Sequence, residues 1–203
     1  MTEFVHGHLL LPFVARCRGT LLRPVRADDA EPLFPQIHRR REVTRWLCWT
    51  GPDTLEVLRD RYRTWRYGVD EEPAYMFAIE SAEDGAVIGE GSLRFDDHPG
   101  VGELGYWLGE SHHGRGHGRD TVELLTRVGF ELCGAFALTG RVKEGNEASI
   151  RVLNRTGFVQ ERAPRTGGES ALVEDPPIAW IFSKTRRSEG RRPGRLEVQI
   201  ERT

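Results

Sequence analysis

Glycine and basic residues alternate in the stretch "GRGHGR" (114–119), and an amphipathic run follows it directly. The first backbone N–H groups of a helix have no partner within the helix, and the helix dipole places partial positive charge beside them. Glycines allow an anion to come close to those amides, while Arg115 and Arg119 add positive charge. The stretch therefore predicts an anion-binding site at the N-terminus of a helix.

Three familiar kinds of binding site fit this stretch poorly. A P-loop ends in Gly-Lys-Ser/Thr, and neither a lysine nor a hydroxyl stands at that place. The dinucleotide pattern GxGxxG fails because the third glycine comes one residue early. His112, His113 and His117 suggest zinc, but thiols and acids at ligand spacing are missing and a basic loop repels cations, so we expect no metal.

The residues "HGRGHG" (113–118) match Q/R-x-x-G-x-G/A, the pyrophosphate-binding motif of the GCN5-related N-acetyltransferases (GNAT), except that histidine replaces the first Gln or Arg. Over residues 20–185 the sequence resembles the ribosomal-protein (RimJ/RimL-like) branch of that superfamily. Four blocks in family order carry the resemblance: "LLRPVRADDAEPLF" (21–34), "GELGYWLGESHHGRGHGRDTVELL" (102–125), "GRVKEGNEASIRVLNRTGF" (140–158) and "AWIFSKTRR" (179–187). The resemblance implies the GNAT fold, with a central sheet splayed at the cofactor site, and acetyl-CoA as co-substrate.

The resemblance also indicates which residues would hold acetyl-CoA. In the loop these are His113, Gly114, Arg115, Gly116, His117, Gly118 and Arg119. Backbone amides near Leu108 and Gly109 would pair with the pantetheine arm and polarise the thioester carbonyl. Asn146 would hold the arm through its amide, together with Ser149, although Asn is also a common helix cap.

Acetyl transfer to an amine benefits from a base, because only about one lysine-like amine in a thousand is neutral at pH 7. Glu103 lies on the strand that leads into the loop, on the same face as Trp107. The resemblance makes Glu103 the candidate base, with Glu90 in reserve; an exposed strand carboxylate is the alternative. Most of the superfamily protonates the leaving thiolate with a tyrosine where this chain has Leu153. In the RimL-like pattern Ser149 takes that role.

Periodicity predicts the elements that position these residues. Strands are expected over 20–27, 74–80, 86–95, 102–109, 136–143, 158–162 and 178–184, and helices over 119–133 and 146–157. Two earlier helices are expected to begin at capping boxes, Asp28 with Glu31 and Asp53 with Glu56. The pattern indicates an α+β fold, a mixed central sheet of about seven strands flanked by about four helices.

Composition favours one cytoplasmic domain. With 203 residues, 38% of them hydrophobic, the chain can bury one core, and its net charge of −2 argues against a nucleic-acid or membrane-surface partner. No apolar run approaches the roughly 18 residues of a membrane span.

Cys17, Cys48 and Cys133 are odd in number and lack CxxC spacing, which is typical of a reduced protein. Residues 1–18 are expected to be an extension, 19–187 the N-acetyltransferase domain, and 188–203 a basic, disordered tail.

The expected function is transfer of an acetyl group from acetyl-CoA to a primary amine, by direct attack in a ternary complex. The sequence does not choose between a protein N-terminus and a small-molecule amine, and it leaves a homodimer open. A non-catalytic acyl-CoA-binding or sensor protein on the same fold is the alternative, and the intact candidate catalytic residues favour the enzyme. The residues that could line the acceptor site are Trp46, Trp49, Trp65 and Tyr67, although core packing is commoner for each aromatic.

Overall fold

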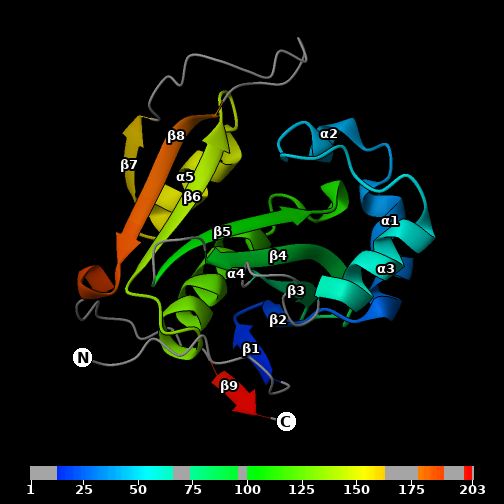
Figure 1. The fold of residues 1–203 in the computed structure, drawn as a ribbon, viewed down its shortest axis with the longest axis horizontal. Coiled ribbons are helices and arrows are strands. Elements are labelled where there is room, and N and C mark those ends of the chain that lie inside the picture. Colours follow the sequence, from blue (N-terminus) through cyan, green and yellow to red (C-terminus); the bar gives the residue numbers. More distant parts are fainter. Residues whose placement is uncertain (1–12, 66–73, 96–99, 163–177, 190–198, 203) are drawn as a thin grey trace.

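The computed structural model of the chain describes residues 13–65, 74–95, 100–162, 178–189 and 199–202 (Figure 1). Within these ranges one mixed sheet has the strand order β7-β8-β6-β5-β4-β3-β2-β1-β9. All neighbouring strands are antiparallel except β5 and β6, which are parallel. The strands are β1 (Phe13–Cys17), β2 (Thr20–Pro24), β3 (Ala74–Ser81), β4 (Val87–Phe95), β5 (Val101–Leu108), β6 (Ala137–Lys143), β7 (Val159–Arg162), β8 (Ile178–Thr185) and β9 (Gln199–Arg202).

The described ranges also hold five α-helices: α1 (Ala30–Ile37), α2 (Arg41–Thr44), α3 (Leu55–Trp65), α4 (His117–Arg127) and α5 (Glu147–Arg155). A π-helical turn, Val128–Leu132, continues α4. None of the helices in this part of the chain is long and apolar enough to cross a membrane. The α+β class is the predicted one, and the sheet has nine strands where the sequence suggested about seven.

The sheet has a separate apolar core on each face, because successive residues of a strand alternate between the faces. On one face Leu104 packs in a cluster with Leu125 of α4 and Leu153 of α5. On the other face Trp107 packs in a cluster with Tyr62 of α3 and with residues of α1. Helices α4 and α5 therefore cover one face, and α1 and α3 cover part of the other.

The first two helix starts differ in detail from the predicted capping boxes. Asp29, rather than Asp28, is the structural acid before α1, because its carboxylate accepts two hydrogen bonds from the buried Arg23 guanidinium at 2.7 and 2.8 Å. At α3 the Thr54 hydroxyl accepts the Val57 N–H at 3.3 Å, so the cap lies one residue later than expected.

Both ends of the described chain join the sheet, which differs from the predicted domain limits. Strand β1 lies within residues 1–18, the expected extension, and it pairs with β2. Strand β9 lies within the tail expected to be disordered, and it pairs with β1 over Gln199–Arg202. The β1–β9 pairing joins segments far apart in the chain and leaves no local sequence pattern, whereas β1 and β2 are separated by only two residues.

Candidate active site

Strands β5 and β6 are paired only at their first residues. Their parallel pairing joins Val101–Glu103 to Ala137–Thr139 and then stops. Beyond that point β5 stays paired with β4 as far as Leu108, and β6 stays paired with β8 as far as Lys143. The two strands therefore diverge, as Figure 1 shows, and the sheet is splayed as the resemblance implies. We call the unpaired stretch of β5 and β6 beyond Glu103 the β5–β6 fork.

The backbone of β5 points alternately to β4 and to the fork. Gly109, directly after the strand, donates its N–H to the Ile88 carbonyl oxygen at 2.9 Å. That amide is turned away from the fork, so the role predicted for it at the thioester does not fit its orientation. Because antiparallel residues alternate, Leu108 directs its N–H and C=O into the fork. Gly109 has a packing role instead, since a Cβ there would lie 2.1 Å from Oε1 of Gln36 in α1.

The glycine loop ends in a helix start that no described side chain caps. Gly114 and Gly116 have φ angles of 75° and 94°, which residues with a side chain rarely adopt. Gly116 is the N-cap residue of α4, and it provides no side-chain cap for the first amides of the helix. Arg115 is exposed beside them. The loop therefore has the conformation and charge of an anion site at a helix N-terminus, as the sequence predicts.

His113 ties the loop to the end of β5. Its Nε2 atom hydrogen-bonds the Leu108 carbonyl oxygen at 3.0 Å, so this nitrogen carries the proton. The side chain predicted to contact the cofactor thus anchors the loop beside the fork. Burial lowers the pKa of His112, and the neighbouring Arg115 and His117 lower it further.

His117 and Arg119, also predicted to contact the cofactor, have protein partners. His117 Nδ1 lies 2.9 Å from Thr20 Oγ1 in β2. The Arg119 Nε donates to Glu123 Oε1 at 3.0 Å, one turn along α4. Both side chains therefore already make contacts within the protein.

The start of α5 brings together the other two predicted residues. Asn146 Oδ1 accepts the Ser149 N–H at 3.2 Å and so caps the helix. The Ser149 side chain acts on the Tyr106 phenol, whose hydroxyl lies 3.6 Å from where a Cβ on Gly118 would be. Burial raises the pKa of Tyr106, and the contact with Ser149 partly lowers it. No sequence pattern predicted a role for Tyr106, although strand alternation places it on the α4 side of β5, on the opposite face from Glu103.

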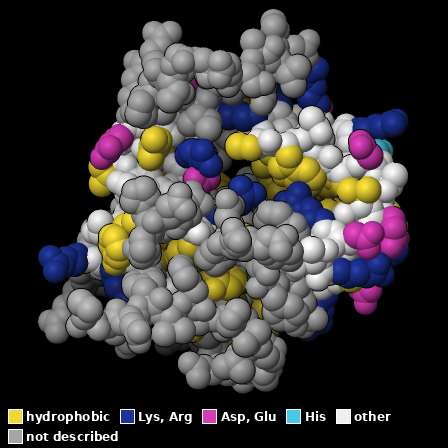
Figure 2. All heavy atoms as spheres, in the orientation of Figure 1, with side chains coloured by type: hydrophobic (Ala, Val, Ile, Leu, Met, Phe, Trp, Pro, Cys, Tyr) yellow, Lys and Arg dark blue, Asp and Glu magenta, His cyan; other side chains and the backbone are white. Residues whose placement is uncertain are grey.

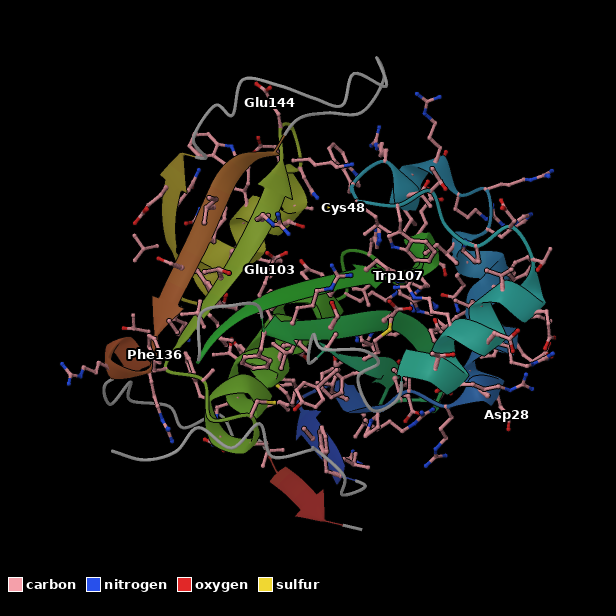
Figure 3. The ribbon with its side chains drawn as sticks, viewed as in Figure 1. Asp28, Cys48, Glu103, Trp107, Phe136 and Glu144 are labelled. Atoms are coloured by element: carbon pink, nitrogen blue, oxygen red, sulfur yellow. The ribbon has the colours of Figure 1, made fainter. Side chains whose placement is uncertain are left out.

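Glu103 lies where the fork begins, and Figure 3 labels it between β5 and β6. Arg141 of β6 donates from Nε to Glu103 Oε2 at 2.8 Å and from Nη2 to Oε1 at 3.0 Å. The Glu103 side chain is 25% exposed, on the face of β5 that it shares with Trp107. Figure 2 shows Lys and Arg side chains gathered around the centre of this face. The predicted base is therefore open to solvent but bound to an arginine.

Glu90 of β4, the reserve candidate, is buried on the same face and lies opposite Trp107. The Tyr62 hydroxyl donates to its Oε2 at 2.8 Å, and Arg61 Nη2 lies 3.5 Å from its Oε1. Burial raises the pKa of Glu90, although Arg61 and Tyr62 act in the opposite direction. Glu90 therefore joins α3 to the sheet from a place shielded from solvent.

The segment after α2 borders the same side of the fork. Lys143, at the end of β6, donates its Nζ to the Arg45 carbonyl oxygen at 3.3 Å. The Arg45 guanidinium lies 4.5 Å from the Trp46 ring centre, and that of Arg61 lies 4.1 Å from the Trp49 ring centre. Of the four aromatics predicted to line the acceptor site, Trp46 is thus near the end of β6, and Trp49 lies against Arg61 of α3. The other two, the Trp65 side chain and Tyr67, lie outside what the structure describes.

Comparison with known proteins identifies this arrangement. The profile of the Acetyltransferase (GNAT) domain matches residues 20–159. The chain is 30% identical over 141 residues to the uncharacterized N-acetyltransferase p20 of Bacillus licheniformis. The aligned region covers 69% of this chain and 79% of that protein.

Two solved structures share the fold. Mycobacterium smegmatis RimJ, in complex with CoA-disulfide, has a TM-score of 0.73 and 20% identity over 90% of this chain and 93% of its own. RimL, a ribosomal alpha-N-protein acetyltransferase in complex with coenzyme A, has a TM-score of 0.68 and 16% identity over 85% of this chain and 97% of its own. The chain therefore belongs to the GNAT family and is an acetyltransferase that uses acetyl-CoA.

Proposed function

We propose that the chain acetylates a primary amine by direct attack on acetyl-CoA in a ternary complex. The observation that carries this proposal is the β5–β6 fork. The uncapped N-terminus of α4 lies on one face of the sheet at the fork, and Glu103 lies on the other face. A thioester passing through the fork would have its pyrophosphate at the loop and its reactive carbonyl on the side of Glu103.

The binding groups follow from which atoms are turned toward the fork and the loop. The amides of residues 114–118 and the Arg115 side chain would bind the pyrophosphate. The Leu108 N–H would polarise the thioester carbonyl. Asn146 would contact the pantetheine arm through its amide nitrogen, since its oxygen caps α5. Acetyl-CoA itself supplies the activated acetyl group.

Glu103 would take the proton of the attacking amine, directly or through one water. The contact with Arg141 holds its carboxylate beside the fork, and its partial exposure gives water access. As the C–N bond forms and the C–S bond breaks, the thiolate needs a proton. Ser149 would donate that proton from its hydroxyl and regain one from solvent, and the neighbouring Tyr106 would orient that hydroxyl.

Glu90 is the second candidate for the base. Its raised pKa favours it, because a base whose pKa lies nearer the working pH transfers protons more effectively. Its position counts against it, because Tyr62 already donates to it and the side chain is buried. Glu103 is preferred because an acceptor amine can reach it without displacing α3.

The acceptor is a primary amine, either a protein N-terminus or a small amine such as an antibiotic or a polyamine. The alternative is an acyl-CoA-binding protein without turnover. To separate them, the protein is incubated with acetyl-CoA and a panel of N-terminal peptides, polyamines and aminoglycosides, and free thiol and N-acetyl product are measured. Thiol release that depends on one amine supports the enzyme. Tight binding of acetyl-CoA with no amine-dependent release would favour the binding protein.

A further inference from the structure

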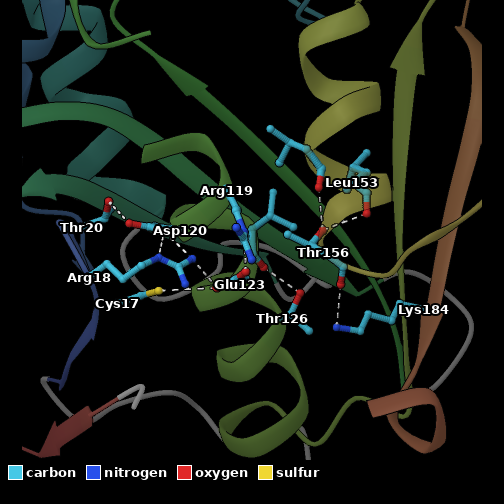
Figure 4. Close-up of polar contacts among 12 residues, drawn as sticks. Cys17, Arg18, Thr20, Arg119, Asp120, Glu123, Thr126, Leu153, Thr156 and Lys184 are labelled. Carbon is cyan, nitrogen blue, oxygen red and sulfur yellow. Dashed lines mark hydrogen bonds and ion pairs between the residues drawn. The ribbon is translucent and has the colours of Figure 1, made fainter. Parts of the chain in front are cut away.

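The turn between β1 and β2 is attached to the first two turns of α4 (Figure 4). Arg18 donates from Nε to Asp120 Oδ1 at 2.7 Å and from Nη2 to Glu123 Oε2 at 2.6 Å. Thr20 Oγ1 lies 2.9 Å from His117 Nδ1 and 3.3 Å from Asp120 Oδ2. Thr20 and Asp120 are both buried. The turn therefore holds the helix whose N-terminus is the proposed pyrophosphate site.

Arg18 makes these contacts from an unfavourable backbone conformation. Its φ angle is 48°, in the left-handed region that favours glycine or asparagine. The next residue is Gly19, where an added Cβ would meet nothing within 4 Å. The turn thus has an arginine at the position where a glycine would be less strained. The strain is kept in a turn that is exposed and open around Gly19, which indicates that the side-chain contacts of Arg18 have a function.

We infer that the Arg18 side chain has an electrostatic function. Asp120 and Glu123 stand in the first two turns of α4, and two carboxylates there repel an anion bound at the helix N-terminus. Arg18 contacts both of them, and Arg119 contacts Glu123 from the other side. The two arginines compensate the negative charge close to the proposed pyrophosphate site.

A metal ion is the other cation that this cluster suggests. Cys17, Asp120 and Glu123 have ligand atoms within 4.8 Å of one another. Arg18, however, already contacts both carboxylates. Burial, followed by the nearby Asp120, raises the pKa of Cys17 to about 12, so its thiol stays protonated at neutral pH. The guanidinium therefore acts as the cation of this cluster.

We propose that Arg18 is a positioning residue for acetyl-CoA: it fixes the start of α4 and offsets Asp120 and Glu123, and so strengthens binding of the pyrophosphate. This inference rests on the proposed function and adds the β1–β2 turn to the cofactor site. Because Arg18 acts from behind the helix, it affects neither the acetyl group nor the amine. Its loss weakens binding and leaves the chemical step unchanged.

The test compares Arg18→Asn with Arg39→Asn. Arg39 is a matched control, an exposed arginine with a φ angle of 53°, and asparagine tolerates this conformation at both places. For Arg18→Asn, the Kd of coenzyme A measured by calorimetry rises roughly tenfold, the size of one partly screened charge interaction. Its kcat at saturating acetyl-CoA stays at the wild-type value. Arg18→Lys recovers most of the affinity, and Arg39→Asn loses none.

A second donor separates the charge effect from a folding effect. S-acetylpantetheine lacks the pyrophosphate, so its kcat/KM is the same for Arg18→Asn and for wild type. Equal loss with both donors would mean that the turn has only a structural role, and the inference would be wrong. Equal coenzyme A affinity in Arg18→Asn and Arg39→Asn would also overturn it. A wild-type protein that binds no coenzyme A would instead refute the proposed function itself.

Discussion

Arg141 binds both carboxylate oxygens of Glu103, at 2.8 and 3.0 Å, at the last position where β5 and β6 are paired. A bidentate contact of this kind fixes the plane of a carboxylate more firmly than a single hydrogen bond does. The ion pair therefore joins the two strands through their side chains at the point where their backbone pairing ends. We infer that the Arg141–Glu103 contact, which joins the two strands where the fork begins, also orients Glu103 as the proposed general base.

Replacing Glu103 by Gln should lower kcat/KM by roughly 10²- to 10⁴-fold, the usual span for a positioned base. The loss should become smaller as the pH rises, because more of the amine is then already neutral. The measurement is a pH–rate profile of the variant beside wild type, with the Kd of acetyl-CoA determined separately.

Glu90→Gln is the matched comparison for that experiment. It removes a carboxylate from the same face and keeps a side chain that can accept the Tyr62 hydrogen bond. We expect it to cost much less activity than Glu103→Gln. If Glu103→Gln keeps wild-type activity at neutral pH while Glu90→Gln loses it, the base is Glu90.

Glu90 should also make stability depend on pH. Burial raises its pKa in the folded protein, so the folded state binds this proton more tightly than the unfolded state does. Its contribution is therefore most favourable below the unfolded pKa, and stability is lost as the pH rises toward the folded pKa. In urea unfolding between about pH 4.5 and 7.5, Glu90→Gln should gain stability relative to wild type as the pH increases. A difference in unfolding free energy between Glu90→Gln and wild type that stays constant over that pH range would contradict a raised pKa for Glu90.

Ser149 and Tyr106 should act as one unit in protonating the leaving thiolate. Ser149→Ala should lower kcat by roughly tenfold, less than loss of the base, and Tyr106→Phe by a smaller factor, since it only orients the serine hydroxyl. In the double variant, Tyr106→Phe should add little to Ser149→Ala, because coupled groups are not additive. Acetyl-CoA affinity should change little in all three variants. Fully additive losses in kcat would mean that the phenol acts independently of the serine.

Gly116→Val should abolish measurable binding of acetyl-CoA. The φ angle of 94° is unfavourable for a β-branched residue by about 1–3 kcal/mol, so the loop amides would be displaced. Gly134→Val is the control, since Gly134 has a φ angle of 71° after the opposite end of α4. Both variants should lose similar stability in thermal unfolding, and only Gly116→Val should lose binding. Unchanged binding in Gly116→Val would remove the loop from the cofactor site.

Local patterns were sufficient to predict most of the fold. The strands from β2 to β8 and the helices α4 and α5 appear close to their predicted limits, because each has its own periodicity. Gly114 and Gly116 could be recognised because a positive φ angle selects for glycine. The pairing of β9 with β1 could not be predicted, since it joins the two ends of the described chain.

The partners of the site residues could not be read from the sequence. Arg141 lies 38 residues after Glu103, and Arg18 lies 102 residues before Asp120, so neither pair leaves a spacing pattern. Tyr106 was missed because a strand tyrosine that faces a helix is most often a core residue. The sequence therefore predicts which residue types are present at the site, and the topology decides which of them touch.

The central claim is that acetyl-CoA lies in the β5–β6 fork with its pyrophosphate at the start of α4. A crystal structure of the protein with coenzyme A tests it most directly. We predict that the pantetheine arm lies between the two strands beside the Leu108 N–H, and that the pyrophosphate oxygens accept hydrogen bonds from amides of residues 114–118. We also predict that Arg18 keeps its contacts with Asp120 and Glu123 behind the helix. A pantetheine arm outside the fork, or a pyrophosphate away from the loop, would contradict this account.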